Sequence, residues 1–145
     1  ASSAPQIRYP DCYGIDMAKL HDFIAFQAAI ELLKETKRGH IINEVYAKSK
    51  EQENLPKEKI VNYVTEIYKS LTPGQISEKI SQMLHTSGIK SEITVIYQKI
   101  EDMHAACPDH TGDWYFTGRY PTPGGNKVVN RAFINYIEGR DVRAY

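Results

Sequence analysis

The sequence predicts a mainly α-helical protein with about six helices and little sheet. Three observations lead to this class. Apolar residues recur at the 3.6-residue spacing of helices over most of the chain. Glycines and prolines stand between these stretches, where helices begin or end. The length of 145 residues suits one domain with a single hydrophobic core.

The first part of the chain is expected to be a short extended segment followed by two helices. Residues 5–15 place prolines among apolar positions, which favours an extended edge segment. Asp16 is a suitable N-cap for a helix over about 17–38 that ends at Gly39. Because apolar residues wrap most of the way around this helix, it is expected to be the core helix or a contact surface for a missing neighbour. A shorter helix is expected over about 40–49.

The middle of the chain predicts two further helices. Pro56 suits the first turn of a third helix, whose apolar stripe runs from Ile60 to Leu71. Thr72 and Gln75 have the spacing of a capping box at the start of a fourth helix. That helix is expected to end at Gly88.

Two helices and a loop complete the predicted fold. Ser91 can cap a fifth helix, whose buried face carries Ile93, Ile96, Tyr97, Ile100 and Met103. The segment Gly112–Asn126 contains the only tryptophan and is rich in glycine, proline and other aromatic residues. It predicts an ordered loop pressed against the helical body. Asn126 is expected to cap the last helix, which Gly139 closes.

Composition does not favour functions that depend on a large net charge. Hydrophobic residues make up 41% and charged residues 25% of the chain, as in ordinary soluble globular proteins. The 18 basic residues balance 18 acidic ones, so composition does not favour nucleic acid or an anionic membrane as partner. No apolar run approaches the length of a membrane span. The two cysteines, Cys12 and Cys107, suggest a reducing compartment, with the cytoplasm as the expected location.

The sequence contains only weak motifs for a metal site or a catalytic nucleophile. His104, Cys107 and His110 lie at three-residue intervals, but Pro108 breaks the helix that would align them and no second pair completes a zinc site. A helix end capped by polar groups is the favoured interpretation. A lone cysteine is more often a small buried hydrophobe than a nucleophile.

Two binding motifs are also disfavoured. Residues 121–127 place glycines before a helix but lack the spacing of a phosphate-binding loop, and their prolines remove backbone donors. A turn leading into the last helix is favoured there. Residues 75–100 could form a helix-turn-helix with its turn at 86–88. Because acidic residues such as Glu92 and Glu101 oppose an approach to phosphates, helix packing is the favoured interpretation.

Two specific motifs occur in a fixed order. Residues 2–17 contain SSAP followed by YGIDM, and residues 116–122 are FTGRYPT. Together they resemble the C-terminal part of amidophosphoribosyltransferase, the glutamine-dependent enzyme that makes phosphoribosylamine at the entry to purine synthesis. Residues 22–25 are also similar to the ELIA that opens the family's next helix. The stretch 27–106 shows no comparable similarity.

The resemblance implies that this chain is the C-terminal part of a larger enzyme. Residues 1–17 would be a remnant of the phosphoribosyltransferase domain, and residues 18–145 would form a helical C-terminal region. The two motifs would pack together, with the Gly112–Asn126 loop as a structural seal. The positions implied to lie beside the family's purine-nucleotide pocket are Tyr13, Asp16, Met17 and Ala18.

The resemblance also implies what this part of the enzyme lacks. Residue 1 is Ala1 where the glutaminase needs a cysteine nucleophile, and no acidic-pair loop for the ribose phosphate occurs, so no catalytic residue is expected. Magnesium with phosphoribosyl pyrophosphate is implied for the parent enzyme only. Asp109, Gly112 and Tyr115 occupy positions where some members carry cysteines, so an iron–sulfur cluster is not expected. Cys12 and Cys107 are expected to be neighbouring reduced thiols.

The implied partner is the remainder of the parent enzyme, which is expected to form a homo-oligomer in the cytoplasm. Nucleic acid and membrane are not expected as partners. A stand-alone helical interaction module without catalysis remains the alternative.

Overall fold

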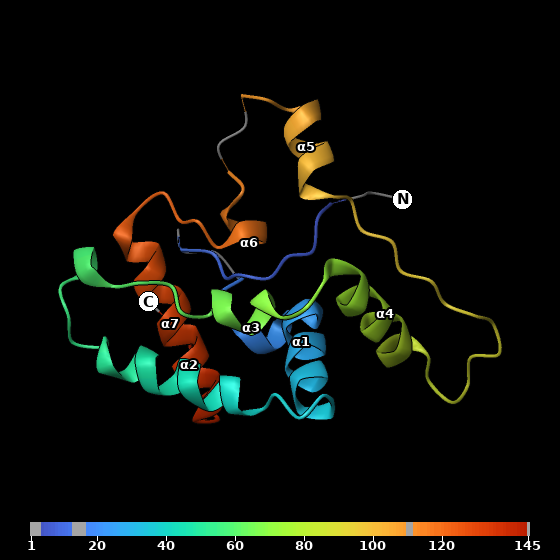
Figure 1. Cartoon of the computed structure of the whole chain (residues 1–145), viewed down its shortest axis with the longest axis horizontal. Helices are drawn as coiled ribbons and strands as arrows, with labels where there is room; N and C mark the ends of the chain where they lie inside the picture. The colour runs from blue at the N-terminus through green and yellow to red at the C-terminus, as the bar shows by residue number, and fades with distance from the viewer. Residues whose placement is uncertain (1–3, 13–16, 110–111, 145) are drawn as a thin grey trace.

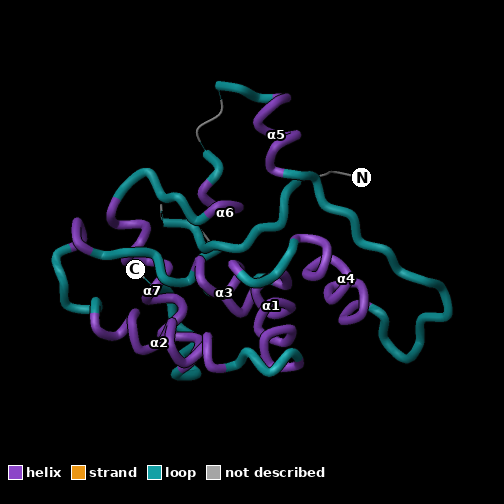
Figure 2. The backbone as a smooth tube through the Cα atoms, in the orientation of Figure 1, coloured by secondary structure: helices purple, strands orange, loops and turns teal. Residues whose placement is uncertain are grey.

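The protein is mainly helical, as the sequence predicts. The computed structural model describes residues 4–12, 17–109 and 112–144. Within these ranges the chain forms seven α-helices and two 3₁₀ helices, and no strand (Figure 2). They are η1 (Leu20–Asp22), α1 (Ile24–Glu35), α2 (His40–Glu51), η2 (Lys57–Lys59), α3 (Thr65–Lys69), α4 (Pro73–Leu84), α5 (Ile100–Ala106), α6 (Trp114–Thr117) and α7 (Pro123–Ile137).

Helix α1 is the centre of the core (Figure 1). It contacts α4, α3 and α2, and α7 lies against α2, η2 and η1. Phe26 of α1 is fully buried and meets the rings of Phe133 and Tyr136 of α7 edge-on, at centroid distances of 6.1 and 4.9 Å. Its nearly continuous apolar surface is therefore covered by helices of the same chain, which identifies α1 as the core helix.

Helix α1 is shorter than the sequence predicts at both ends. The predicted N-cap, Asp16, lies outside the described residues, and α1 begins at Ile24 after an extended Phe23 that offers no side-chain cap. The extended residue turns both Leu20 and Phe23 into the core, where they are 1% and 5% exposed. Burial of these two side chains therefore outweighs helix continuation.

The C-terminus of α1 also differs from the prediction. The helix ends at Glu35, and Lys37 takes the left-handed conformation with φ 59°. The amide of Arg38 then donates to the carbonyl of Leu33 at 2.7 Å, which satisfies a free carbonyl at the helix end. Gly39, the predicted stop, has helical dihedrals and precedes α2 instead.

Helix α2 matches its prediction closely, but the predicted third helix does not form as one element. It is divided into η2, an extended stretch 60–62 and the short α3. Two polar side chains hold the extended stretch. The Gln52 Oε1 accepts from the Val61 amide at 2.8 Å, and the Asn62 Oδ1 accepts from the Val64 amide at 3.1 Å. Side-chain hydrogen bonds of this kind compete with helical ones.

Helix α4 confirms the predicted capping box. The Gln75 amide donates to Thr72 Oγ1 at 3.2 Å, and the Thr72 amide donates to Gln75 Oε1 at 2.8 Å. The helix ends at Leu84, before the predicted stop at Gly88.

The predicted helix from Ser91 is wrong in its first half. Residues 85–99 are non-helical and form an extended arm that runs past α4 to α5 (Figure 1), with Val95 and Tyr97 packed against the core. Its run Ile93-Thr94-Val95-Ile96 is β-branched, which disfavours a helix. The Val95 amide donates to Ser81 Oγ at 3.0 Å and the Gln98 amide to the Ala4 carbonyl at 3.2 Å. Because residues 89–99 are not helical, no second helix follows the turn at 86–88, and a helix-turn-helix is excluded.

The predicted loop Gly112–Asn126, called the aromatic loop from here on, contains α6 and the first turn of α7. Helix α7 begins at Pro123 after Thr122, so Asn126 is not its cap. Asn126 instead donates from Nδ2 to the Ile60 carbonyl at 2.9 Å, because its place in the first turn faces the extended stretch. Gly139, with φ 67°, follows the end of α7 as predicted, and the Arg140 amide donates to the Asn135 carbonyl.

Candidate functional site

The segment between the SSAP and YGIDM motifs lies against the FTGRYPT region. Residues 4–12, the N-terminal segment, run beside α6 (Figure 1). The amides of Arg8 and Tyr9 both donate to the Tyr115 carbonyl, at 2.8 and 3.1 Å. The Tyr120 hydroxyl donates to the Pro10 carbonyl at 2.6 Å. Residues 8–10, between SSAP and YGIDM, are therefore bound to Tyr115, which directly precedes FTGRYPT, and to Tyr120 within it.

Gly118 is the closest point of this contact. Its φ of 73° lies in the left-handed region, and a Cβ there would stand 2.8 Å from the Tyr9 ring and 2.9 Å from Asn62 Nδ2. Asn62 also donates to the Gly118 carbonyl at 3.0 Å. Glycine is required here for two separate reasons, backbone conformation and space.

Buried tyrosines form the floor of the contact. Burial raises the pKa of Tyr9 and Tyr120 well above the ordinary value of 10.0. Burial likewise raises the pKa of Tyr68, whose ring meets Tyr9 edge-on at 5.3 Å and whose hydroxyl donates to the Arg8 carbonyl at 3.0 Å. All three phenols are poor acids, and those of Tyr68 and Tyr120 donate to backbone carbonyls.

The structure describes two of the four residues predicted to lie beside a nucleotide pocket. Tyr13 and Asp16 lie outside the described residues. Ala18 is buried, with 1% of its surface exposed, while Met17 is 37% exposed and accepts from the Asp11 amide at 2.7 Å. Of the two described residues, Met17 is the one whose side chain can reach a ligand.

Met17 borders a hollow of about 530 Å³. Its lining comes from the N-terminal segment, the start of α1 and the arm, and comprises Ala4, Pro5, Ile7, Met17, Asp22, Phe23, Ile24, Ala25, Val95, Ile96 and Tyr97. Asp22 is the single charged residue of this lining. A lining without a cation does not suit a phosphate, so this hollow by itself fits an apolar group.

The aromatic loop follows His104, Cys107 and His110 closely in the sequence. Within the described part of the chain, no three His, Cys, Asp or Glu side chains are grouped as metal ligands would be. His104 Nε2 lies 3.3 Å from Asp113 Oδ2, and Arg119 donates to the same oxygen at 2.7 Å. Both cysteines are free thiols. His110 lies outside the described residues, and the proximity of Cys12 to Cys107 stays a prediction.

Asp113 is the charged anchor of this region. Partial burial raises its pKa, but the hydrogen bond and charge of Arg119 outweigh burial and hold the pKa below the ordinary 3.8. The Asp113 carboxylate therefore contacts both His104 of α5 and Arg119 of the aromatic loop. These contacts stabilise the position of the aromatic loop beside α5.

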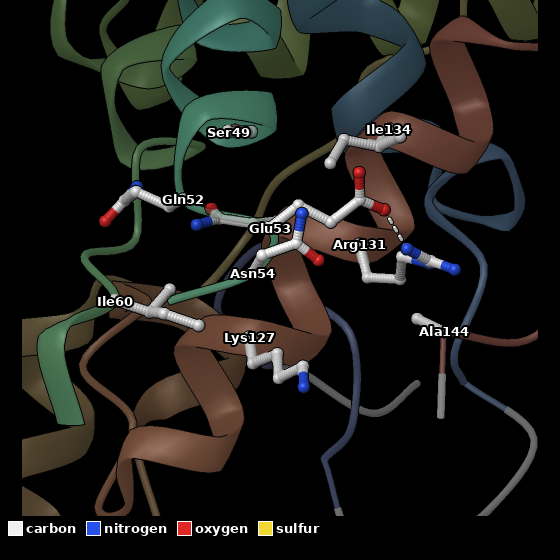
Figure 3. A pocket seen from close by; sticks show the side chains of 10 residues that line it. Ser49, Gln52, Glu53, Asn54, Ile60, Lys127, Arg131, Ile134 and Ala144 are labelled. Carbon is white, nitrogen blue, oxygen red and sulfur yellow. Dashed lines mark hydrogen bonds and ion pairs between the residues drawn. The ribbon is translucent and has the colours of Figure 1, made fainter. Parts of the chain in front are cut away.

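A second hollow was not anticipated from the sequence. It has a volume of about 420 Å³ and lies between the end of α2 and the face of α7 that carries Lys127 and Arg131 (Figure 3). The two cations stand four residues apart on a helix, which places them on one face. That spacing was the available signal, but a pair of exposed cations on a helix is too common to indicate a site.

No family model, curated protein or solved structure matches this chain. No helix in the described ranges combines the length and apolar character that a bilayer crossing requires.

Proposed function

We propose that the chain is the C-terminal region of a glutamine-dependent amidophosphoribosyltransferase. The observation that carries this proposal is the contact of residues 8–10, just before YGIDM, with Tyr115 and Tyr120. Residues 27–106, which show no family likeness, separate these two segments in the chain. The Tyr120 hydroxyl bond to the Pro10 carbonyl, at 2.6 Å, lies within that contact. Motifs that a family keeps in order are expected to remain close when the segment between them is elaborated.

In this proposal the chain has a structural or regulatory role and supplies no catalytic group. The parent's preceding domains carry the glutaminase cysteine and the loop that binds magnesium and phosphoribosyl pyrophosphate. Residues 1–17 end the transferase domain, residues 18–145 pack on it, and the homo-oligomeric enzyme works in the cytoplasm. An iron–sulfur cluster is not part of the proposal, because the chain offers two thiols and a cluster takes four.

The first test is the reading frame to which this chain belongs. The proposal requires an upstream cysteine-initiated glutaminase and an acidic-pair loop for the ribose phosphate. The purified product should then release pyrophosphate from phosphoribosyl pyrophosphate in the presence of glutamine. A frame without these two segments, or a product without this activity, overturns the proposal.

The second test concerns the predicted nucleotide pocket. In the active parent, Met17→Ala should weaken inhibition by AMP or GMP about three- to tenfold, the effect of losing one apolar contact. Leu84→Ala is the matched control, since Leu84 is 42% exposed at the end of α4, a similar exposure far along the chain. Equal inhibition of both variants would remove Met17 from the pocket.

The alternative is a stand-alone helical interaction module. It is supported by the completeness of the core, in which Phe26, Leu33 and Phe133 are fully buried by this chain alone. The intact mass of the natural gene product separates the two proposals. A product of this size that is present without any longer form supports the module, and a larger product supports the enzyme.

A further inference from the structure

The second half of the arm has the side-chain pattern of a strand. Partly buried and exposed side chains alternate along residues 92–97. The partly buried ones are Ile93, Val95 and Tyr97, and the exposed ones are Glu92, Thr94 and Ile96. A period of two places one face on the core and leaves the other open. Within the described ranges, however, no strand pairs with this stretch.

The backbone of this stretch is also largely unpaired. Among the described residues, two amides between 92 and 98 find an acceptor. Val95 donates to Ser81 Oγ at 3.0 Å, and Gln98 donates to the Ala4 carbonyl at 3.2 Å. The remaining amides have no described acceptor, and the carbonyls of 92–98 accept from no described donor. An extended segment with free amides and carbonyls can pair with a strand of another domain.

Ile96 is the centre of the open face. It is 84% exposed, the highest value for a large apolar side chain that the structure describes. Two hollows lie against the arm, and Ile96 lines both of them. One, of about 560 Å³, is shared with α4, and the other, of about 530 Å³, with the start of α1. An exposed apolar side chain between two hollows forms a surface that a neighbouring domain can cover.

Helix α5 continues this surface. It has no buried residue, and it projects from the helical body in Figure 1. Its apolar side chains Ile100 and Met103 are only partly covered. A helix of seven residues is marginal in water unless it packs against other structure. A domain that covers the arm would supply such packing.

The chain enters the structure at this same surface. Ala4 is the first described residue, its carbonyl accepts from Gln98, and it lines the hollow beside α1. The N-terminal segment begins beside the first turn of α5 (Figure 1). A domain that precedes residue 4 is therefore tethered within a few residues of the arm. Because a short tether gives an effective concentration in the millimolar range, even a weak contact would be occupied.

We propose that the arm, α5 and the two hollows form the surface on which the domain preceding residue 4 docks. The inference rests on the proposed function, in which residues 1–17 end a transferase domain. That domain would pair an extended edge with residues 93–97 and place apolar side chains around Ile96. A second copy of the chain is the competing occupant, and the tether at Ala4 favours the preceding domain.

Hydrogen exchange of the complete parent protein tests the contact. The unpaired amides between 92 and 98 should exchange roughly tenfold or more slowly than those of Ser87, Gly88 and Lys90, after correction for intrinsic rates. The latter three are exposed in the same arm and also lack described acceptors, so they are the internal control. Docking supplies the acceptors that this chain does not.

Matched variants of the parent test the apolar part of the contact. Ile96→Asp should speed exchange of the unpaired amides about tenfold or more, because it places a charge where an isoleucine is covered. Val142→Asp is the control, since Val142 is 54% exposed on the C-terminal tail, and it should leave these amides unchanged. Both side chains are mainly exposed in this chain, so neither change should unfold it.

The outcomes separate this inference from the proposed function. An active parent whose unpaired arm amides exchange as fast as the control amides overturns the docking surface alone. Equal effects of Ile96→Asp and Val142→Asp also overturn it. Slow exchange that is lost when the parent is diluted to single protomers assigns the arm to a second copy and overturns it as well. A natural product without a preceding domain overturns both proposals. Slow exchange in single protomers that Ile96→Asp alone abolishes supports the inference.

Discussion

Replacing Gly118 by alanine tests whether the aromatic loop holds the N-terminal segment. Gly118 has φ 73°, and an added Cβ would stand 2.8 Å from the Tyr9 ring and 2.9 Å from Asn62 Nδ2. Gly139 is the matched control. It has a similar φ of 67°, but nothing lies within 4 Å of the position of its Cβ. The two substitutions share the backbone strain and differ only in the space available.

The magnitudes follow from these two terms. The left-handed conformation costs an alanine about 1–2 kcal/mol, so Gly139→Ala should lower the free energy of unfolding by that amount. Gly118→Ala adds the overlap with Tyr9 and Asn62. Inserting one carbon into a packed site costs about 1–3 kcal/mol, so the total is about 2–5 kcal/mol. For a chain of this size the extra loss corresponds to roughly 3–10 °C in melting temperature.

Urea denaturation followed by circular dichroism measures both variants. Hydrogen exchange should in addition show faster exchange of the Arg8 and Tyr9 amides in Gly118→Ala, because both donate to the Tyr115 carbonyl in this contact. If the two variants lose the same stability, or if these two amides exchange as in the parent chain, the close contact at Gly118 does not hold the N-terminal segment.

Three further predictions concern the caps and the titrating groups. Thr72→Ala should reduce the free energy of unfolding by about 1 kcal/mol through loss of the capping box, and an unchanged urea midpoint would contradict the role of the cap. Asp113→Asn should destabilise the protein at pH 7. Its lowered pKa makes the carboxylate's contribution complete above pH 3.8 and lost as the pH falls through the folded value, so the two proteins should converge in acid-denaturation curves. Tyr9, Tyr68 and Tyr120 have raised pKa values in the folded protein, whereas the unfolded phenols ionise near pH 10.0. The folded state should therefore keep its full stability below pH 10.0 and lose stability as the pH rises above it. In absorbance titrations these phenols should therefore ionise only with unfolding, and three ordinary phenol titrations would refute the burial argument.

Local sequence chemistry predicted the elements whose stability is local. The capping box of Thr72 and Gln75 is present with both hydrogen bonds, since all its partners lie within one turn. Helix α2 also formed as predicted. The predictions failed where a distant group decides the backbone. Residues 60–62 are extended because Gln52 and Asn130 bind the backbone of Val61, and the arm follows partners in Ser81 and Ala4.

The candidate sites also divide into features that local sequence predicts and features that depend on distant residues. The resemblance predicts that the YGIDM and FTGRYPT segments pack together. The structure shows residues 8–10 against Tyr115 and Tyr120, while Tyr13 to Asp16 lie outside the described residues. The roles of Tyr13, Asp16, Met17 and Ala18 stay predictions. The hollow beside Lys127 could not be predicted from the sequence, because its lining comes from residues 49–60, α7 and Ala144, which only the packing of α2 against α7 brings together.

The sequence by itself determined the helical class, the extent of α2, the start of α4, the end of α7 and the pair of family-like motifs. These depend on spacing, capping and turn chemistry over a few residues. The tertiary structure alone decided where α1 begins, which predicted helix is an extended arm, and which side of α7 faces a hollow. Each of these is set by burial or by hydrogen bonds between residues distant in the chain. The free energy of such contacts exceeds local helix propensity, which amounts to less than about 1 kcal/mol per ordinary residue.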